Sequence, residues 1–271
     1  MRYMNIKLKQ IISKLSNILA LSENDFKSRY AGNFLGVLWA FIYPCVTVVL
    51  YWFVFQVALK SNVSANGNEN VPYILWLVSA LVPYFFLCDA LPGTASVMID
   101  YSYLVKKVKF DTGALPLVRV ISNLRVNIFF VILLMCMSLY FGYSFKPKDL
   151  WVIYYMTAEF IFILAFGTLL SVLTVFIRDI RSIIGVAVQI GYWLTPLFWD
   201  ISGIDSRLGM IIMAVNPITY ITEGFRNTIL YGASPLDMPC YTLYFWCVTL
   251  ALCGAGYVLF RKVKNSLADY V

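Results

Sequence analysis

The side chains that most often carry catalysis or metal binding are scarce in this sequence. Histidine is absent from all 271 residues, which removes the usual general base, proton relay and zinc ligand. No glycine is followed by lysine, so the phosphate-binding loop of an ATP-hydrolysing enzyme is missing too. The cysteines form no CxxC pair. We therefore expect no catalytic residue, metal or cofactor in this chain, and any ATP chemistry should belong to a partner.

Two carboxylates fall inside long apolar runs, where a charge is costly. Asp89 and Glu159 have no basic residue nearby in the sequence. A carrier driven by protons would usually show several such groups, commonly with Lys, Arg or His among them. A coupling role and structural hydrogen bonding both remain open for these two side chains.

Aromatic side chains make up 17% of the chain, and several lie within apolar runs rather than at their ends. Aromatic faces stack on sugar rings and can line a path for a polymer, although dry packing between helices explains them equally well. The candidates for a substrate path are Trp39, Tyr43, Tyr192, Trp193, Phe198 and Trp199.

The elements that must position these residues are membrane helices. The chain is 61% hydrophobic and only 13% charged, with a mean hydropathy of +0.77, whereas soluble domains carry about a quarter charged residues. This composition predicts an all-α integral membrane protein with no sizeable soluble domain. The predicted spans are Leu35–Leu59, Pro72–Met98, Val126–Tyr143, Leu150–Ile177, Ile183–Ile201 and Tyr241–Phe260.

The distribution of positive charge predicts the orientation. With both termini in the cytoplasm, sixteen of the 21 Lys and Arg residues fall on the cytoplasmic side, as the positive-inside rule requires. The remaining external residues are Lys60, Lys146, Lys148, Arg207 and Arg226. This asymmetry accounts for the net charge of +7 without a nucleic-acid partner.

Three segments outside the spans have distinctive patterns. Residues 1–30 carry apolar residues at helical spacing among lysines, which predicts a helix along the inner membrane surface. Asp100–Arg125 is too polar to span and too apolar for a free loop, and it predicts a short docking helix or a solvated basic loop. The connection before the last span stays apolar and breaks at Asn216-Pro217 and Gly232, which favours re-entrant helices on the outer side.

Four pieces in order make the chain similar to a known family. They are Asp25-Phe-Lys-Ser-Arg-Tyr30 followed by Leu35-Gly-Val-Leu-Trp39 and Pro44, then Phe176-Ile-Arg-Asp-Ile180, then Leu194-Thr-Pro-Leu-Phe-Trp199, and Asn216-Pro217 leading to Glu223-Gly-Phe-Arg226. The chain resembles, over nearly its whole length, the permease subunits of ATP-binding-cassette exporters for O-antigen, capsular polysaccharide and teichoic acid.

The resemblance implies a homodimer of six-span subunits in the bacterial cytoplasmic membrane, clasped by two ATPase subunits that bind ATP and Mg. It implies one permease domain, with an interface helix over 1–30, the span bundle over 35–260 and a cytoplasmic tail over 261–271. The first and fifth spans would line the path for a polyprenyl-diphosphate-linked glycan. The candidates for the ATPase interface are Asp100, Tyr101, Leu104, Phe110, Arg178 and Asp179.

Basic residues at the cytoplasmic mouth of such a path would attract the diphosphate of the lipid. The candidates are Arg29, Lys106, Lys107 and Lys109, and for each the alternative is an ordinary solvated positive charge. Other functions remain open: export of a drug or small lipid, a membrane glycosyltransferase, and a proton-driven carrier. The glycosyltransferase would need clustered carboxylates for a metal and a nucleotide, and the sequence offers only scattered ones.

Overall fold

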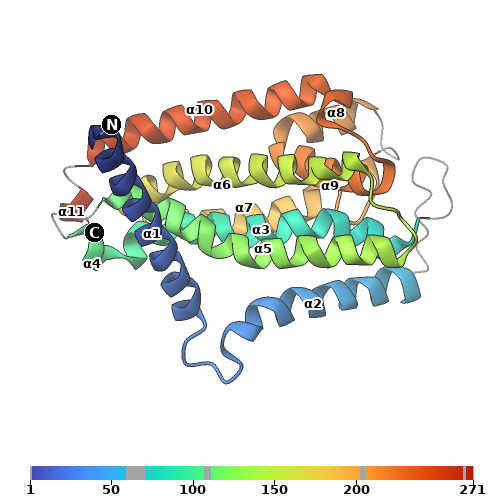
Figure 1. Ribbon diagram of the computed structural model, residues 1–271. Coiled ribbons are helices and arrows are strands. Elements are labelled where there is room, and N and C mark those ends of the chain that lie inside the picture. Colours follow the sequence, from blue (N-terminus) through green and yellow to red (C-terminus); the bar gives the residue numbers. More distant parts are fainter. Residues whose placement is uncertain (1, 59–70, 107–110, 202–205, 265–266, 271) are drawn as a thin grey trace.

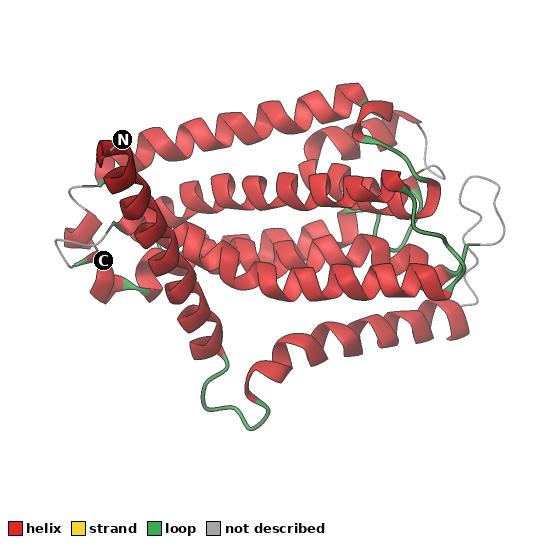
Figure 2. Ribbon diagram, in the orientation of Figure 1, coloured by secondary structure: helices red, strands yellow, loops and turns green. Residues whose placement is uncertain are grey.

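The computed structural model describes residues 2–58, 71–106, 111–201, 206–264 and 267–270, and all regular structure in these ranges is helical (Figures 1 and 2). The α-helices are α1 Arg2–Arg29, α2 Trp39–Trp52, α3 Tyr73–Asp100, α4 Ser102–Val105, α5 Leu115–Tyr140, α6 Trp151–Phe176, α7 Ile180–Leu194, α8 Ser206–Val215, α9 Pro217–Tyr231, α10 Pro239–Val263 and α11 Leu267–Tyr270. Short turns extend several of them: η1 Gly36–Leu38, η2 Phe53–Ala58, η4 Thr112–Ala114, η5 Pro147–Leu150 and η7 Pro235–Asp237.

Helix α3 is the centre of the bundle. Its most apolar stretch is 78% buried, against 11% for the helix of residues 36–58. It contacts α5, α6, α7 and α9, while α2 and α10 lie along opposite edges (Figure 1). A helix that is apolar on every face is stable only when neighbours cover it, which is why α3 takes the middle position.

Five of the six predicted spans correspond to helices long and apolar enough to cross a membrane: residues 36–58, α3, α5 with η4, α6 with η5, and α10. The multi-pass, all-α prediction is therefore confirmed. The predicted fifth span is α7, which has only 15 residues. It ends at Leu194 because Thr195 takes an extended conformation (ψ 138°), as expected for a residue that precedes proline.

The polar stretch Asp100–Arg125 contains the short helix α4, while residues 115–125 form the start of the long helix α5. The prediction of a separate short helix is therefore wrong for residues 115–125, and docking of α4 on a partner stays a prediction. Two of the polar side chains that lowered the hydropathy pair with each other: Arg119 and Asp100 are 2.8 Å apart between Nη2 and Oδ2.

Helices α8 and α9 form a bent pair at the end of the bundle opposite the two chain ends (Figure 1). Their axes differ by 103°, and the break falls at Asn216-Pro217, where the sequence predicts it. The Asn216 side chain caps α9 by accepting from the Ile218 amide at 3.1 Å, and Gly232 ends α9 with a φ of 64° that suits glycine. Insertion of this pair into the membrane from outside stays a prediction.

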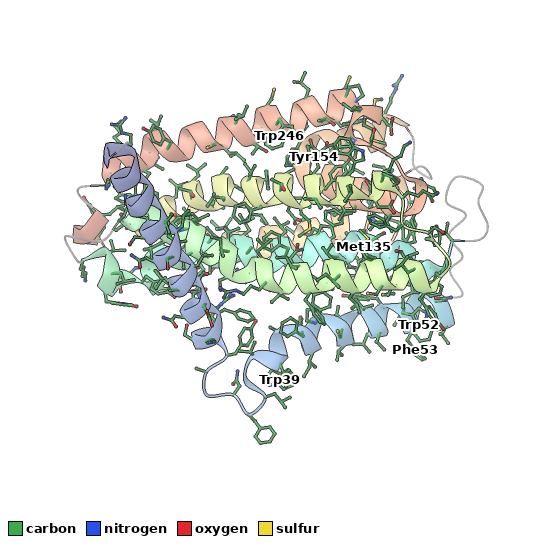
Figure 3. All side chains as sticks on the ribbon, viewed as in Figure 1. Trp39, Trp52, Phe53, Met135, Tyr154 and Trp246 are labelled. Carbon is green, nitrogen blue, oxygen red and sulfur yellow. The ribbon has the colours of Figure 1, made fainter. Side chains whose placement is uncertain are left out.

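Polar contacts between aromatic side chains join α6 to α10. Trp246 donates from Nε1 to the Tyr154 hydroxyl at 2.8 Å, and the two side chains lie side by side in Figure 3. Each ring thereby packs in an apolar environment while its polar atom has a partner.

Helix α9 packs closely on α6 at a glycine, which gives a test of the fold. A Cβ at Gly224 would overlap the Tyr155 ring. Gly224→Ala should therefore lower stability by about 1–3 kcal/mol through overpacking, measured as a lower melting temperature in detergent. The matched control is Gly254→Ala in α10, where a Cβ would meet nothing within 4 Å. Equal melting temperatures for the two variants would contradict the α6–α9 packing.

Candidate functional site: a cavity between α2, α3 and α7

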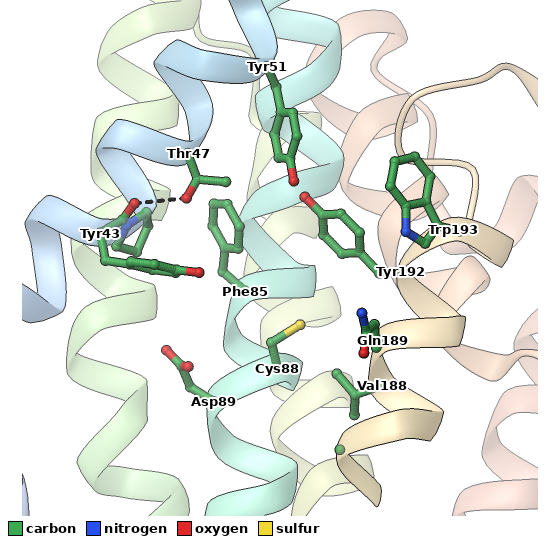
Figure 4. Close-up of a pocket in the computed structure, with 12 residues that line it drawn as sticks. Tyr43, Thr47, Tyr51, Phe85, Cys88, Asp89, Val188, Gln189, Tyr192 and Trp193 are labelled. Atoms are coloured by element: carbon green, nitrogen blue, oxygen red, sulfur yellow. Dashed lines mark hydrogen bonds between the residues drawn. The ribbon is translucent and has the colours of Figure 1, made fainter.

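A cavity of about 520 Å³ opens between three helices of the bundle (Figure 4). This volume lies within the range of about 300–1,000 Å³ that small-molecule sites usually occupy. Its lining residues are Tyr43, Pro44, Thr47 and Tyr51 of α2, Phe85, Cys88 and Asp89 of α3, and Gly185, Val188, Gln189, Tyr192 and Trp193 of α7.

Helical spacing explains why these residues share one space. Tyr43, Thr47 and Tyr51 recur every four residues and so occupy one face of α2. The Thr47 hydroxyl donates to the Tyr43 carbonyl at 2.9 Å, so its proton is used within the helix. On α7, Gln189 and Trp193 are likewise four residues apart, and their side chains face the cavity in Figure 4.

Aromatic packing fixes the outer wall of the cavity. The Tyr192 ring has its centroid 5.3 Å from those of both Tyr84 and Phe198. Phe198 in turn stacks on Phe55 at 5.2 Å, and Trp199 donates from Nε1 to the Trp193 carbonyl at 3.2 Å. Phe198 thus holds the segment after α7 against η2 through Phe55 and against α2 through Tyr51, by ring contacts rather than by charges.

The six path candidates fall into three groups. Tyr43, Tyr192 and Trp193 line the cavity. Phe198 and Trp199 pack behind it. Trp39 is not among the lining residues, and it lies 44% exposed at the start of α2 (Figure 3).

Nine of the twelve lining residues were not predicted as site residues, among them Tyr51, Phe85 and Gln189. Tyr51 follows Tyr43 by eight residues and Gln189 precedes Trp193 by four. Extending the helical face from the predicted aromatics would therefore have found both.

The two carboxylates within the bundle have different environments. Asp89 is exposed to the cavity, and Figure 4 shows its carboxyl group directed toward the Tyr43 side. Glu159 on α6 is completely buried, and neither of its oxygens has a hydrogen-bond partner within the described part of the chain. The choice between a coupling role and a structural one stays open for Glu159.

At the end of the bundle that carries α4 and the chain termini, charged residues hold α1 against the other helices. Asp25 of α1, with its side chain 1% exposed, accepts from the Tyr101 hydroxyl at 2.6 Å. It also lies 3.5 Å from a nitrogen of Arg29 and of Arg119. Burial and the hydrogen bond to Asp25 both raise the pKa of Tyr101.

The gate candidate Arg29 is already engaged within the protein. Its guanidinium donates to the side-chain amide oxygen Oδ1 of Asn123 at 2.7 Å and to the Ser122 hydroxyl at 2.6 Å. Lys106 is exposed, while Lys107 and Lys109 lie outside the described residues. Among the described candidates, Lys106 is the more accessible cation.

The ATPase-interface candidates differ in accessibility. Asp100 pairs with Arg119, and Tyr101 bonds to Asp25. Leu104 is partly buried in an apolar cluster, and Phe110 lies outside the described residues. Arg178 and Asp179 are exposed in the turn between α6 and α7. Tyr103, which was not predicted, is 56% exposed on α4.

A buried arginine connects α9 to α3 and to the segment after α7. Arg226 donates from Nη1 to Glu223 at 2.5 Å and from Nη2 to the Leu197 carbonyl at 3.1 Å. Its guanidinium carbon lies 3.7 Å from the centroid of the Trp76 ring, in cation–π geometry. Arg226 was counted among the external charges, but its side chain is only 2% exposed and does not lie in a solvated loop.

These features define a multi-pass membrane protein with a polar, aromatic-lined cavity within its helical bundle. Residues 16–230 match the family model described as ABC-2 type transporter, and the chain belongs to this family of membrane transport proteins.

Three curated relatives are similar over nearly their full length, and each is named O-antigen export system permease protein RfbA. One, from Myxococcus xanthus, is 26% identical over 94% of this chain and 95% of its own length. Two from Klebsiella pneumoniae are 22% and 21% identical, each over 98% of this chain and 99% of the relative.

Proposed function

We propose that the chain is the transmembrane subunit of an ATP-binding-cassette exporter. Its cargo is a polysaccharide such as O-antigen, capsule or teichoic acid, linked to a polyprenyl diphosphate. The observation that carries this proposal is the near full-length similarity to three O-antigen export permeases. The cavity supports it, because aromatic faces beside hydroxyl and amide groups suit a sugar chain.

The energy source in this proposal is a separate ATPase, present in two copies and carrying ATP and Mg. Membership of the ABC-2 type transporter family supports such a partner. The surface offered to it consists of α4 with exposed Tyr103 and Lys106, and the exposed turn of Arg178 and Asp179. We expect no catalytic residue in the permease itself.

A second copy of the chain completes the path in this proposal. The cavity lies beside apolar side chains of α2 and α7 that are more than half exposed, such as Val49 and Ile190. Either lipid or a second subunit can cover such a surface. Two cavities facing each other would enclose a route that shields a diphosphate from hydrocarbon. Placing a charge in hydrocarbon costs about 3 kcal/mol or more.

The proposed location is the bacterial cytoplasmic membrane, with both termini inside. Both ends of the described chain lie at the end of the bundle that also carries α4 (Figure 1). The exposed Ile12, Leu15 and Leu19 of α1 can rest on lipid at that surface. On this placement α8 and α9 enter the membrane from outside, and residues 1–271 form one permease domain.

The central test is assembly and stimulation. The permease is purified with the products of neighbouring genes, and ATP hydrolysis is measured in nanodiscs with and without a polyprenyl-diphosphate oligosaccharide. We expect an ATPase to co-purify and the glycan to raise its turnover. Recovery without any ATPase would overturn the proposal, and stimulation by a drug or small lipid but by no glycan would favour the alternative cargo.

The cavity aromatics give a more specific prediction. Tyr43→Ala and Trp193→Ala should each weaken glycan stimulation about threefold to tenfold, because one stacking contact is worth about 0.5–1.5 kcal/mol. Hydrolysis without glycan should not change. Tyr140→Ala is the matched control, since Tyr140 is 86% exposed at the end of α5, away from the cavity. Equal losses of basal and stimulated hydrolysis would indicate packing instead of substrate contact.

A further inference from the structure

One charged side chain lies in the cavity between α2, α3 and α7. Among the described residues that line it, Asp89 is the only Asp, Glu, Lys or Arg. Its carboxyl group is exposed to the cavity. A carboxylate within a membrane-spanning segment is costly, and such groups usually mark a substrate pathway.

Among the described residues, the salt bridges do not include Asp89, and the cation Arg29 has other partners. The Arg29 guanidinium donates instead to Ser122 and Asn123, and it also lies beside Asp25. The Asp89 oxygens therefore remain able to accept hydrogen bonds from a molecule in the cavity.

The opposite wall supplies complementary groups. Gln189 of α7 presents a carboxamide, which both donates and accepts, across the cavity from α3 (Figure 4). Tyr43 adds a hydroxyl from α2, and Trp193, 61% exposed, offers a ring face. A sugar matches these groups. Its hydroxyl groups can bond to the Asp89 carboxylate and the Gln189 amide, and its apolar face can stack on the Trp193 ring.

We propose that this cavity is a saccharide subsite that selects uncharged, hydroxyl-bearing sugar units. Asp89 is its specificity-determining residue, and Gln189 is its hydrogen-bonding partner. The inference rests on the proposed function and narrows the cargo. Polymers with a carboxylate or phosphate in each repeat bring a like charge toward Asp89 at every unit, whereas the diphosphate of the carrier passes only once per chain. A teichoic acid is therefore disfavoured, and a neutral O-antigen or capsule is favoured.

The test compares two probes on the assembled exporter. Both are synthetic polyprenyl-diphosphate oligosaccharides of equal length, one built of hexoses and the other with a hexuronic acid in place of one hexose. Stimulation of ATP hydrolysis is titrated with each probe in nanodiscs. The wild-type protein should respond to the hexose probe at a concentration at least about tenfold lower, because like charges at short range repel strongly in a low-dielectric site.

Variants assign this selectivity to Asp89. Asp89→Asn should reduce the ratio between the two probes to less than about threefold, while Asp89→Glu should keep the preference for hexose. The matched control is Asp149→Asn, the same chemical change in η5, where the carboxylate accepts from the Lys146 amide and does not line the cavity. The control should keep the full ratio.

The possible outcomes distinguish failure of the proposed subsite from failure of the proposed exporter function. If both probes stimulate the wild-type exporter at the same concentration, the subsite is overturned while the exporter assignment stands. Selectivity that persists unchanged in Asp89→Asn removes Asp89 from the role. If neither glycan stimulates hydrolysis, the proposed function fails and this inference with it. The wild-type comparison needs no variant, so a misfolded Asp89→Asn protein does not prevent the decision.

Discussion

Arg226→Leu should destabilise the protein by about 3–5 kcal/mol, because it leaves the buried Glu223 without its cation. In detergent we expect a fall in melting temperature on the order of 10 °C. The change also removes the donor to the Leu197 carbonyl and the guanidinium from the Trp76 ring. The segment that carries Phe198 and Trp199 would then lose one of its connections to α9, while the bond from Asn216 to Thr195 remains.

Two controls separate charge burial from a general effect of the substitution. The double variant Glu223→Leu with Arg226→Leu should recover much of the lost stability, since no unpaired charge then remains in the interior. Lys27→Leu removes the cation of another close ion pair, to Glu23 at 2.7 Å, but both of those side chains are more than half exposed. Its melting temperature should not change. A similar loss in Arg226→Leu and Lys27→Leu would contradict the buried position of Arg226.

The second large effect concerns Arg119, the cation shared by α1 and α3. Arg119→Met removes one of the positive partners of the buried Asp25 and the 2.8 Å bond to Asp100. We expect α1 to detach from the bundle more often, so that trypsin cleaves at Lys27 and Arg29 at least about tenfold faster, as local opening becomes more favourable. Glycan-stimulated ATP hydrolysis should fall as well, because α1 and α4 both lie on the proposed ATPase side.

Arg181 offers a matched comparison for Arg119. It also faces Asp100, but at 3.9 Å and with its side chain 61% exposed. Arg181→Met should therefore leave the protection of α1 close to that of the wild type. If Arg119→Met kept the same protection, the ion network would not be what holds α1 on the bundle.

The long helices of this fold were predictable because a long apolar run in the sequence indicates a segment that is buried in protein or lipid. Helix ends were less predictable where tertiary contacts decide them. Asp100 and Arg119 are nineteen residues apart and lowered the hydropathy of the segment between two predicted spans, yet they pair with each other at the ends of α3 and α5. Hydropathy cannot show such a pairing, since it counts the charges without their partners.

The candidate site was predictable in part for a similar reason. Tyr43, Tyr192 and Trp193 stand out in the sequence as aromatic residues on helical faces, and all three line the cavity. The place of Asp89 among them depends on how α3 is rotated against α2 and α7, which no local pattern determines. The opposite situation of Glu159, buried among apolar side chains, depends on the same kind of rotation.

The shortness of α7 has a consequence for the surrounding lipid. Its 15 residues extend about 22 Å at 1.5 Å per residue, whereas the hydrocarbon layer is about 30 Å thick. Such hydrophobic mismatch is relieved by local thinning of the bilayer, which brings headgroups and water toward the mouth of the cavity. For the proposed exporter, the distance that a lipid-borne diphosphate travels through hydrocarbon would then be shorter where it enters. Acyl-chain length in the host membrane thereby becomes a physical variable of this protein's activity.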